Sequence, residues 1–262
     1  MTEYVEGRVA VDGLELRYVE AGEGPTLVWL HGAGGLYITA GTDLLAEHVR
    51  LIALELPGFG SSAHHDTARS FDELGEQVAE GLHALGLRRY LLHGTSFGGA
   101  TALHLALNHP ERVERLVLES PSAFRPPGWT PPDLDTVRRG LFRHPERARR
   151  AQVDPERALK ERALVNRFSL TIDREALAAR VRGLQVPTLV MFGDADTLTP
   201  PELAHMYCDN APDCTSVLIE DAAHVISSDQ PEAYARAVTE FALGTRRSLG
   251  GFATLPIRFT RR

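Results

Sequence analysis

Short runs of apolar residues recur along the chain, and the segments between them carry apolar residues at helical spacing. Runs of this kind are typical of strands buried on both faces of a parallel sheet. The alternation of strand and helix predicts an open, doubly wound α/β sheet. The six clearest runs are TLVWLHG (26–32), RLIALELPG (50–58), RYLLHGTS (89–96), RVERLVLES (112–120), VPTLVMFGD (186–194) and TSVLIED (215–221).

The segment before these runs follows a different pattern. Residues 6–22 alternate between apolar and polar positions and contain the dipeptide Asp12-Gly13. Alternation with such a dipeptide favours two strands joined by a tight turn. We therefore expect an antiparallel hairpin at the edge of the sheet, which brings the total to about eight strands.

Three segments between the strands carry helix signals. Ser70 precedes a helical period and Glu73 stands three residues later, the spacing of a capping box. A second helical period begins directly after Ser96 and stops at a proline. A third has Pro231 near its start and Gly244 just past its end, where these two residue types favour helix boundaries.

The alternation of strand and helix patterns stops over residues 122–185, where the sequence becomes proline-rich and then arginine-rich. Residues 125–182 contain thirteen Arg and one Lys against eight acidic residues, a net charge of +6, while the rest of the chain carries −13. We expect residues 122–185 to form a helical cap inserted into a core made of 1–121 and 186–245. The basic tail, 246–262, shows no helical period, and we assign no function to it.

Composition narrows the class of protein. The chain has 262 residues, 43% of them hydrophobic, and a net charge of −7, which gives no electrostatic reason to bind nucleic acid or anionic membranes. No stretch is long and apolar enough for a membrane span or a signal segment, so we expect a cytoplasmic protein that acts on a small molecule. Cys208 and Cys214 match neither a redox pair nor a zinc site, and we expect two reduced thiols.

Ser96 is the strongest chemical signal in the sequence. It lies in GTSFG (94–98), a G-x-S-x-G pattern, with a strand-like run before it and a helical period after it. In so sharp a turn, side chains two residues before and after the serine would collide with neighbouring elements, which requires Gly94 and Gly98. A serine hydroxyl becomes a nucleophile only where a base takes its proton and donors stabilise the oxyanion.

This strand, turn and helix around Ser96 resemble the nucleophile elbow of the α/β-hydrolase family, and the resemblance covers nearly all of the chain apart from the tail. It implies an α/β-hydrolase fold, with a mostly parallel eight-stranded sheet and an inserted helical cap. It also implies that a catalytic acid and then a histidine follow the serine along the chain, each after a strand.

The resemblance assigns the acid and the base to particular loops. In GDADTLTP (193–200) the family's G-x-x-D-x-x-x-P layout places the acid at Asp196, while Asp194 fits a turn residue. Glu119 remains the competing acid, because some relatives place it after the earlier strand. The base falls on His224, in the loop after the last predicted strand.

The same resemblance places the oxyanion hole at the backbone N–H groups of Ala33 and Phe97. Ala33 lies in HGAGG (31–35), where Gly32 and Gly34 would let the backbone approach the substrate. The chemistry requires no cofactor, and the histidine spacing does not suggest a metal site. The expected partner is a small-molecule substrate, and a homodimer remains open.

The cap sequence bears on the substrate. DPERALKERALVNRF (154–168) resembles the cap of hydrolases that cleave carbon–carbon bonds in ring-fission dienoates, with Arg162 at the position that binds the substrate carboxylate. That group usually has asparagine before the serine and tryptophan after the histidine, where this chain has Thr95 and Val225. Hydrolysis of a carboxylic ester, lactone or thioester therefore ranks first, and carbon–carbon hydrolysis second. A ligand receptor that keeps the fold without turnover is the alternative from another class.

Overall fold

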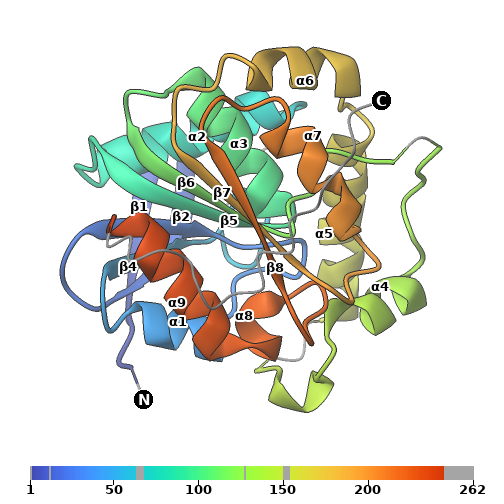
Figure 1. Ribbon diagram of the computed structural model, residues 1–262. Helices are drawn as coiled ribbons and strands as arrows, with labels where there is room; N and C mark the ends of the chain where they lie inside the picture. Colours follow the sequence, from blue (N-terminus) through green and yellow to red (C-terminus); the bar gives the residue numbers. More distant parts are fainter. Residues whose placement is uncertain (1, 12, 63–67, 127, 150–153, 245–262) are drawn as a thin grey trace.

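The computed structural model describes residues 2–11, 13–62, 68–126, 128–149 and 154–244, and eight strands of these residues form one sheet (Figure 1). The strands are β1 (Val5–Val11), β2 (Leu14–Ala21), β3 (Thr26–Leu30), β4 (Arg50–Leu54), β5 (Tyr90–Thr95), β6 (Val113–Glu119), β7 (Thr188–Gly193) and β8 (Cys214–Ile219).

The order of the strands across the sheet is β1-β2-β4-β3-β5-β6-β7-β8. β1 and β2 pair antiparallel, as do β2 and β4, and all the other neighbours pair parallel. The mostly parallel eight-stranded sheet and the hairpin at its edge are therefore confirmed. Because parallel strands end at the same edge, the loops that follow β3, β5, β6, β7 and β8 meet there.

Helices cover both faces of the sheet and enclose two separate hydrophobic clusters. Leu27 and Trp29 of β3 belong to one cluster, and Val28 and Leu30 belong to the other, as the period of two of a strand requires. Helices α1, α8 and α9 pack together on the first face, while α2 and α3 pack together on the second. The helices are α1 (Ala40–Leu45), α2 (Phe71–Ala84), α3 (Phe97–Asn108), α7 (Ala204–Cys208, after the short η2, Pro201–Leu203), α8 (Ile226–Asp229) and α9 (Pro231–Ala242).

The predicted helix boundaries are confirmed with one change at the start of α2. The Ser70 hydroxyl accepts a hydrogen bond from the Glu73 N–H at 3.3 Å, as an N-cap does. The Glu73 carboxylate, however, accepts from the N–H of Arg69 and not from that of Ser70. In the expected capping box the Glu73 carboxylate would bind the N–H of the N-cap residue, and here it binds the N–H one residue before the N-cap.

Between β6 and β7 the described residues form helices and no strand. These are α4 (Leu134–Leu141), η1 (Pro145–Arg147), α5 (Pro155–Ser169) and α6 (Arg174–Val181). In Figure 1, α4 and α5 lie to the right of the sheet. Phe168 of α5 and Leu177 of α6 are buried in the core cluster on the α2–α3 face, so the segment is anchored by apolar contacts. The basic tail lies outside the described residues.

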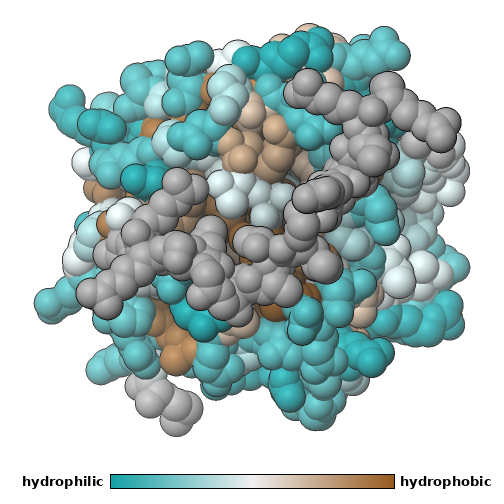
Figure 2. Space-filling model, in the orientation of Figure 1, coloured by the Kyte–Doolittle hydropathy of each residue, from teal (hydrophilic) through white to brown (hydrophobic). Residues whose placement is uncertain are grey.

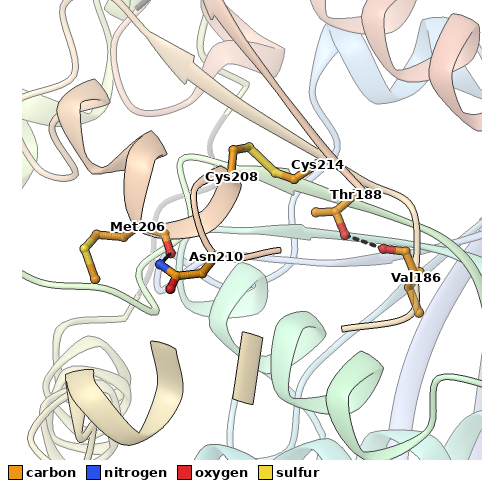
Figure 3. The surroundings of a disulfide bond; sticks show 6 residues. All are labelled: Val186, Thr188, Met206, Cys208, Asn210 and Cys214. Atoms are coloured by element: carbon orange, nitrogen blue, oxygen red, sulfur yellow. Dashed lines mark hydrogen bonds between the residues drawn. A yellow bond between two sulfur atoms is a disulfide. The ribbon is translucent and has the colours of Figure 1, made fainter. Parts of the chain in front are cut away.

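Cys208 and Cys214 form a disulfide bond, so the expectation of two reduced thiols was wrong (Figure 3). Cys208 ends α7 and Cys214 begins β8, and the short turn between them brings the two Cα atoms to 4.9 Å. That separation lies in the range that a disulfide spans. The spacing of six residues does not reveal this approach, because it depends on how the chain turns between helix and strand.

Hydrophilic residues dominate the face of the molecule drawn in Figure 2. In the part of the chain that the structure describes, four large hydrophobic residues are exposed: Val5, Leu134, Leu159 and Leu170. A search of the described helices finds none that is both long and apolar enough to cross a bilayer.

Candidate active site

The turn between β5 and α3 holds Ser96 in a strained backbone conformation. Its φ of 52° and ψ of −110° lie in a region that residues with a side chain rarely occupy. A Cβ atom on Gly94 would lie 2.3 Å from the carbonyl oxygen of Gly98, and one on Gly98 would lie 2.3 Å from that of Leu30. The predicted need for glycine on both sides of Ser96 is therefore confirmed.

The backbone of Ser96 is tied to the loop that follows β6. Its N–H donates to the carbonyl of Glu119 at 2.9 Å, and its carbonyl accepts from the N–H of Ser122 at 3.0 Å and from that of Ala100 at 3.0 Å. These bonds hold the serine in place against neighbouring strands. The hydroxyl is therefore presented to the cavity from a fixed backbone.

His224 connects Ser96 to Asp196. Its Nδ1 lies 2.9 Å from Oδ2 of Asp196, and its Nε2 lies 2.8 Å from the Ser96 hydroxyl oxygen. With the Nδ1 proton donated to the carboxylate, Nε2 is left to accept the serine proton. His224 and Asp196 are each only 4% exposed, so this chain of hydrogen bonds is shielded from bulk water.

Backbone and hydroxyl donors surround the Asp196 carboxylate. It accepts from the N–H groups of Leu198 at 2.8 Å and Thr199 at 3.0 Å, and from the Thr199 hydroxyl at 2.7 Å. Burial alone would raise the pKa of the Asp196 carboxyl. The neighbouring His224 and these hydrogen-bond donors lower it by more, so the pKa lies below its usual value. Asp194, two residues earlier, is exposed and accepts from the Ala222 N–H, which fits a turn residue.

Glu119, the competing acid, bonds to other groups. Its carboxylate accepts from the Thr95 hydroxyl at 2.7 Å and from the Ser227 N–H at 2.8 Å. These contacts join the residue before Ser96 to the first turn of α8, which follows His224. Burial raises the pKa of the Glu119 carboxyl, although both donors and His224 act against that effect. Asp196, and not Glu119, contacts the histidine.

Glu119→Gln is expected to gain stability relative to the wild type as pH rises. The difference between the two free energies of unfolding should grow above pH 4.5, the ordinary pKa of this group. With a raised pKa the folded protein binds the proton more tightly than the unfolded chain, so the wild-type free energy of unfolding falls as pH rises through that window. Glutamine keeps both contacts without a charge, because its oxygen can accept from the Ser227 N–H while its amide donates to the Thr95 hydroxyl oxygen. Urea denaturation at several pH values measures the difference.

Glu114→Gln, on the exposed face of the same strand, is the matched control and should show no such trend. A Glu119→Gln protein whose stability relative to wild type falls with rising pH would contradict this account of the buried carboxyl.

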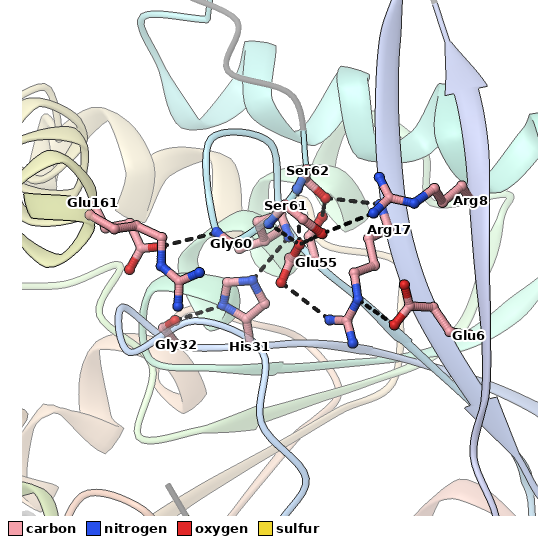
Figure 4. Close-up of polar contacts among 12 residues, drawn as sticks. Glu6, Arg8, Arg17, His31, Gly32, Glu55, Gly60, Ser61, Ser62 and Glu161 are labelled. Atoms are coloured by element: carbon pink, nitrogen blue, oxygen red, sulfur yellow. Dashed lines mark hydrogen bonds and ion pairs between the residues drawn. The ribbon is translucent and has the colours of Figure 1, made fainter. Parts of the chain in front are cut away.

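His31 positions the loop that carries Ala33. Its Nε2 accepts from the Leu56 N–H at 3.0 Å, so Nδ1 carries the proton and donates to the Gly32 carbonyl at 2.7 Å (Figure 4). Burial lowers the pKa of His31 to about 4, which keeps the ring neutral near pH 7. A Cβ on Gly32 would lie 3.3 Å from the Ser96 Cβ, so this loop passes close to the serine.

The expected oxyanion donors are two backbone N–H groups, one in a turn and one at the start of a helix. Ala33 follows Gly32 in a turn that the Gly35 N–H closes by donating to the Gly32 carbonyl at 3.2 Å. Phe97 is the first residue of α3, where a helix leaves backbone N–H groups without internal acceptors. Among the described residues, neither N–H group has a hydrogen-bond acceptor.

A buried glutamate supports the turn below this loop (Figure 4). The Glu55 carboxylate accepts from the N–H groups of Ser61 at 2.8 Å and Ser62 at 2.9 Å, and pairs with Arg17 at 3.3 Å. The adjacent Gly60 N–H donates to Glu161 of α5 at 3.0 Å. The turn after β4 thus links the edge hairpin to α5.

Ser96 and His224 open into a cavity of about 490 Å³. One face of α4 and one face of α5 line it, together with Gly32, Ala33 and Gly34 of the glycine loop. The lining residues of α4 are Leu134, Val137, Arg138 and Leu141, and those of α5 are Pro155, Ala158, Glu161, Arg162, Val165, Asn166 and Ser169.

Arg162 lines this cavity, and its guanidinium donates to the Pro132 carbonyl. Sequence reasoning gave no role to two other lining residues, Arg125 and Trp129. Arg125 was one of many arginines in a basic segment, and no spacing set it apart. Among the described residues, no group of three or more His, Cys, Asp or Glu side chains could hold a metal ion.

The loop that carries His224 is fixed from the other side by α4. The Val225 N–H donates to the Leu141 carbonyl at 2.9 Å. The fully buried Asp229 accepts from the N–H groups of Ala223, Arg143 and His144 at 2.8, 2.8 and 2.9 Å. One carboxylate therefore binds both the histidine loop and the chain that leaves α4.

Comparison with known proteins places this geometry in a family. The profile of the alpha/beta hydrolase family matches residues 27–237. The chain is 28% identical to the 2-hydroxy-6-oxo-6-(2'-aminophenyl)hexa-2,4-dienoic acid hydrolase of Metapseudomonas resinovorans, covering 91% of each sequence. It is 30% identical to the pimeloyl-acyl-carrier-protein methyl ester esterase of Yersinia enterocolitica, over 84% of this chain and 95% of that one.

A solved structure shows the same fold. The 2-hydroxy-6-oxo-6-phenylhexa-2,4-dienoate hydrolase of Rhodococcus sp. strain RHA1 superposes with a TM-score of 0.76 at 22% identity, over 92% of this chain and 99% of that one. The sequence profile, the relatives named as hydrolases and the shared eight-stranded architecture agree. The chain is a hydrolase that belongs to the alpha/beta hydrolase family.

Proposed function

We propose that this protein is a serine hydrolase that cleaves a carboxylic ester of a small molecule through an acyl-enzyme. The observation that carries the proposal is the position of the His224 ring, with one nitrogen 2.9 Å from Asp196 and the other 2.8 Å from the Ser96 hydroxyl. This is the geometry in which a histidine can take the proton of a serine while a carboxylate holds its tautomer.

The proposed reaction proceeds in two halves. The Ser96 oxygen attacks the ester carbonyl carbon as His224 takes its proton, and the oxyanion accepts from the N–H groups of Ala33 and Phe97. His224 then protonates the leaving alcohol as the C–O bond breaks. A water molecule then gives its proton to His224 and attacks the acyl carbon. As the bond between the acyl carbon and the Ser96 oxygen breaks, His224 returns the proton to that oxygen, which releases the carboxylic acid and free Ser96.

We further propose that residues 122–185 act as a cap over the serine, on a core of 1–121 and 186–245. Supporting this role, α4 and α5 each turn one face into the cavity that holds Ser96. The chain is also tied back to the histidine loop through Asp229. Changes in the lining residues of α4 and α5 would then alter substrate preference while leaving the triad unchanged.

The test is labelling of Ser96 by a fluorophosphonate, followed by turnover of a panel of 4-nitrophenyl esters. A stoichiometric label on the wild-type protein, none on Ser96→Ala, and repeated ester turnover would support the proposal. Labelling without turnover of any ester or dienoate would instead indicate a ligand receptor on a hydrolase fold. Ester hydrolysis by Ser96→Ala at the wild-type rate would rule out the mechanism.

Carbon–carbon hydrolysis of a ring-fission dienoate is the second candidate function. The relative in Metapseudomonas resinovorans, whose name gives a dienoic acid as substrate, favours it, as does Arg162 in the cavity wall. Thr95 and Val225, beside the serine and the histidine, favour the ester. A dienoate assayed beside the ester panel decides between them, because its carbon–carbon cleavage can be followed as loss of the conjugated chromophore.

A further inference from the structure

Arg125 is a partly buried cation that the proposed reaction does not use. It follows β6, in the loop that also binds Ser96, and it lines the same cavity as Ser96 and His224. Its Nε atom is buried and has no hydrogen-bond partner. A buried donor of this kind loses its contacts to water without replacing them, which is costly unless a ligand supplies the acceptor.

The charge of Arg125 is not balanced by a neighbouring acid. In the described parts of the chain no Asp or Glu forms an ion pair with it, whereas Arg138 of the same cavity pairs with Asp135 at 3.4 Å. Burial lowers the pKa of Arg125 to about 10, so the guanidinium remains protonated at neutral pH. Among the described residues, the Arg125 guanidinium therefore has no ion-pair partner.

Trp129 packs against this guanidinium. The Arg125 Cζ atom lies 4.3 Å from the centre of the Trp129 ring, which is a cation–π contact. The backbone N–H of Trp129 donates to the Pro126 carbonyl at 3.2 Å. A guanidinium carries its N–H groups in a planar fork, which can bind a carboxylate with two parallel hydrogen bonds.

The position of Arg125 relative to Ser96 is also fixed. Ser122, three residues before Arg125, donates its N–H to the Ser96 carbonyl at 3.0 Å. The Phe124 N–H donates to the Tyr207 hydroxyl at 3.3 Å, and that hydroxyl donates to the Pro121 carbonyl at 3.0 Å. These bonds fix the backbone that leads into Arg125 relative to Ser96.

We propose that Arg125 and Trp129 form an anion-binding subsite, and that the substrate is an ester that carries a carboxylate in addition to its scissile bond. This inference rests on the proposed function and specifies its substrate class. A carboxylate fits because a single guanidinium matches a single negative charge. Arg162, which the family resemblance suggests for an anion, already donates to the Pro132 carbonyl.

The test compares two series of 4-nitrophenyl esters with equal chain lengths, one of monocarboxylic acids and one of dicarboxylic acids esterified at one end. The measured quantity is the ratio of kcat/KM for the charged ester to kcat/KM for the neutral ester at each length. We expect the wild-type protein to prefer the charged ester at one or two lengths. Arg125→Gln should lower that ratio about tenfold or more, because a charge-assisted hydrogen bond is lost.

Three further variants make the result specific to Arg125. Arg125→Lys keeps the charge without the planar fork and should retain part of the preference. Arg139→Gln, at an exposed position of α4, is the matched control and should leave the ratio unchanged. If Arg162→Gln removes the preference while Arg125→Gln keeps it, the anion site is Arg162 and the proposal is wrong. The absence of any preference for charged esters in the wild-type protein would also overturn it.

A binding measurement separates this inference from the proposed function. The aliphatic dicarboxylates from malonate to suberate are titrated into the wild-type protein, and the melting temperature is compared with that in the monocarboxylate of the same length. We expect at least one dicarboxylate to raise the melting temperature more, and Arg125→Gln to remove that difference. This result would support the subsite even if no ester were turned over, and its absence at every length would overturn it.

The unliganded variant gives an independent readout. A buried arginine that serves the fold would destabilise the protein when replaced, but one held for a ligand should not. We therefore expect Arg125→Met, without dicarboxylate, to melt at or above the wild-type temperature. A clear fall in melting temperature would assign Arg125 a structural role and count against the subsite.

Discussion

Replacing Asp196 with asparagine is expected to lower kcat by about 10⁴-fold, while the same replacement at Asp194 leaves it within about twofold. Oδ2 of Asp196 lies 2.9 Å from Nδ1 of His224 and accepts its proton in a hydrogen bond, and Asp196 is 4% exposed. An asparagine there carries no charge, so it cannot stabilise the imidazolium that forms as Ser96 attacks. Its amide can also donate to Nδ1, which would place the ring proton on the nitrogen that must act as base.

Asp194 makes a sharp control because it lies in the same loop, two residues away. Its carboxylate is exposed and accepts from the Ala222 N–H at 3.3 Å, a contact that the oxygen of an asparagine can keep. The measurement is steady-state kinetics on the best ester of the panel, with far-UV circular dichroism to show that both variants fold. Equal losses in the two variants, or full activity in Asp196→Asn, would contradict the assignment of the acid.

Features that depend on local sequence could be predicted. A strand buried on both faces must be apolar at consecutive positions, so β3, β5 and β7 appear as short apolar runs. The strain at Ser96 requires glycine two residues away on each side, and that requirement is visible as G-x-S-x-G. The position of His224 beside Ser96 could be predicted because a family pattern places a histidine after the last strand.

Features that depend on distant segments could not be predicted. Glu119 and Asp196 both follow buried strands, and only the folded chain shows that Glu119 binds Thr95 and Ser227 while Asp196 contacts His224. Arg125 differs from the other arginines of the basic segment only by its surroundings. Its buried Nε atom and its contact with the Trp129 ring appear only in the folded chain.

Replacing Gly98 with alanine is expected to lower the free energy of unfolding by about 3 kcal/mol, because overpacking against fixed backbone is costly. The added methyl group would lie 2.3 Å from the Leu30 carbonyl oxygen and 2.4 Å from that of His31. Both atoms belong to the backbone at the end of β3, so no flexible side chain can move aside. Gly183→Ala is the control, since its nearest neighbour would be the Arg180 carbonyl at 3.4 Å, an ordinary contact.

The same clash should reduce activity beyond the loss of stability. To accept the methyl group, the end of β3 must move away from α3, and it carries with it the loop of His31 and Ala33. The N–H of Ala33 would then separate from that of Phe97, which stays with α3, and the pair would no longer converge on one oxyanion. Urea denaturation measures the first effect, and kcat of the protein that remains folded at low temperature measures the second. A Gly98→Ala protein with wild-type stability and kcat would contradict this account, because it would show that the end of β3 can move away from α3 at no cost.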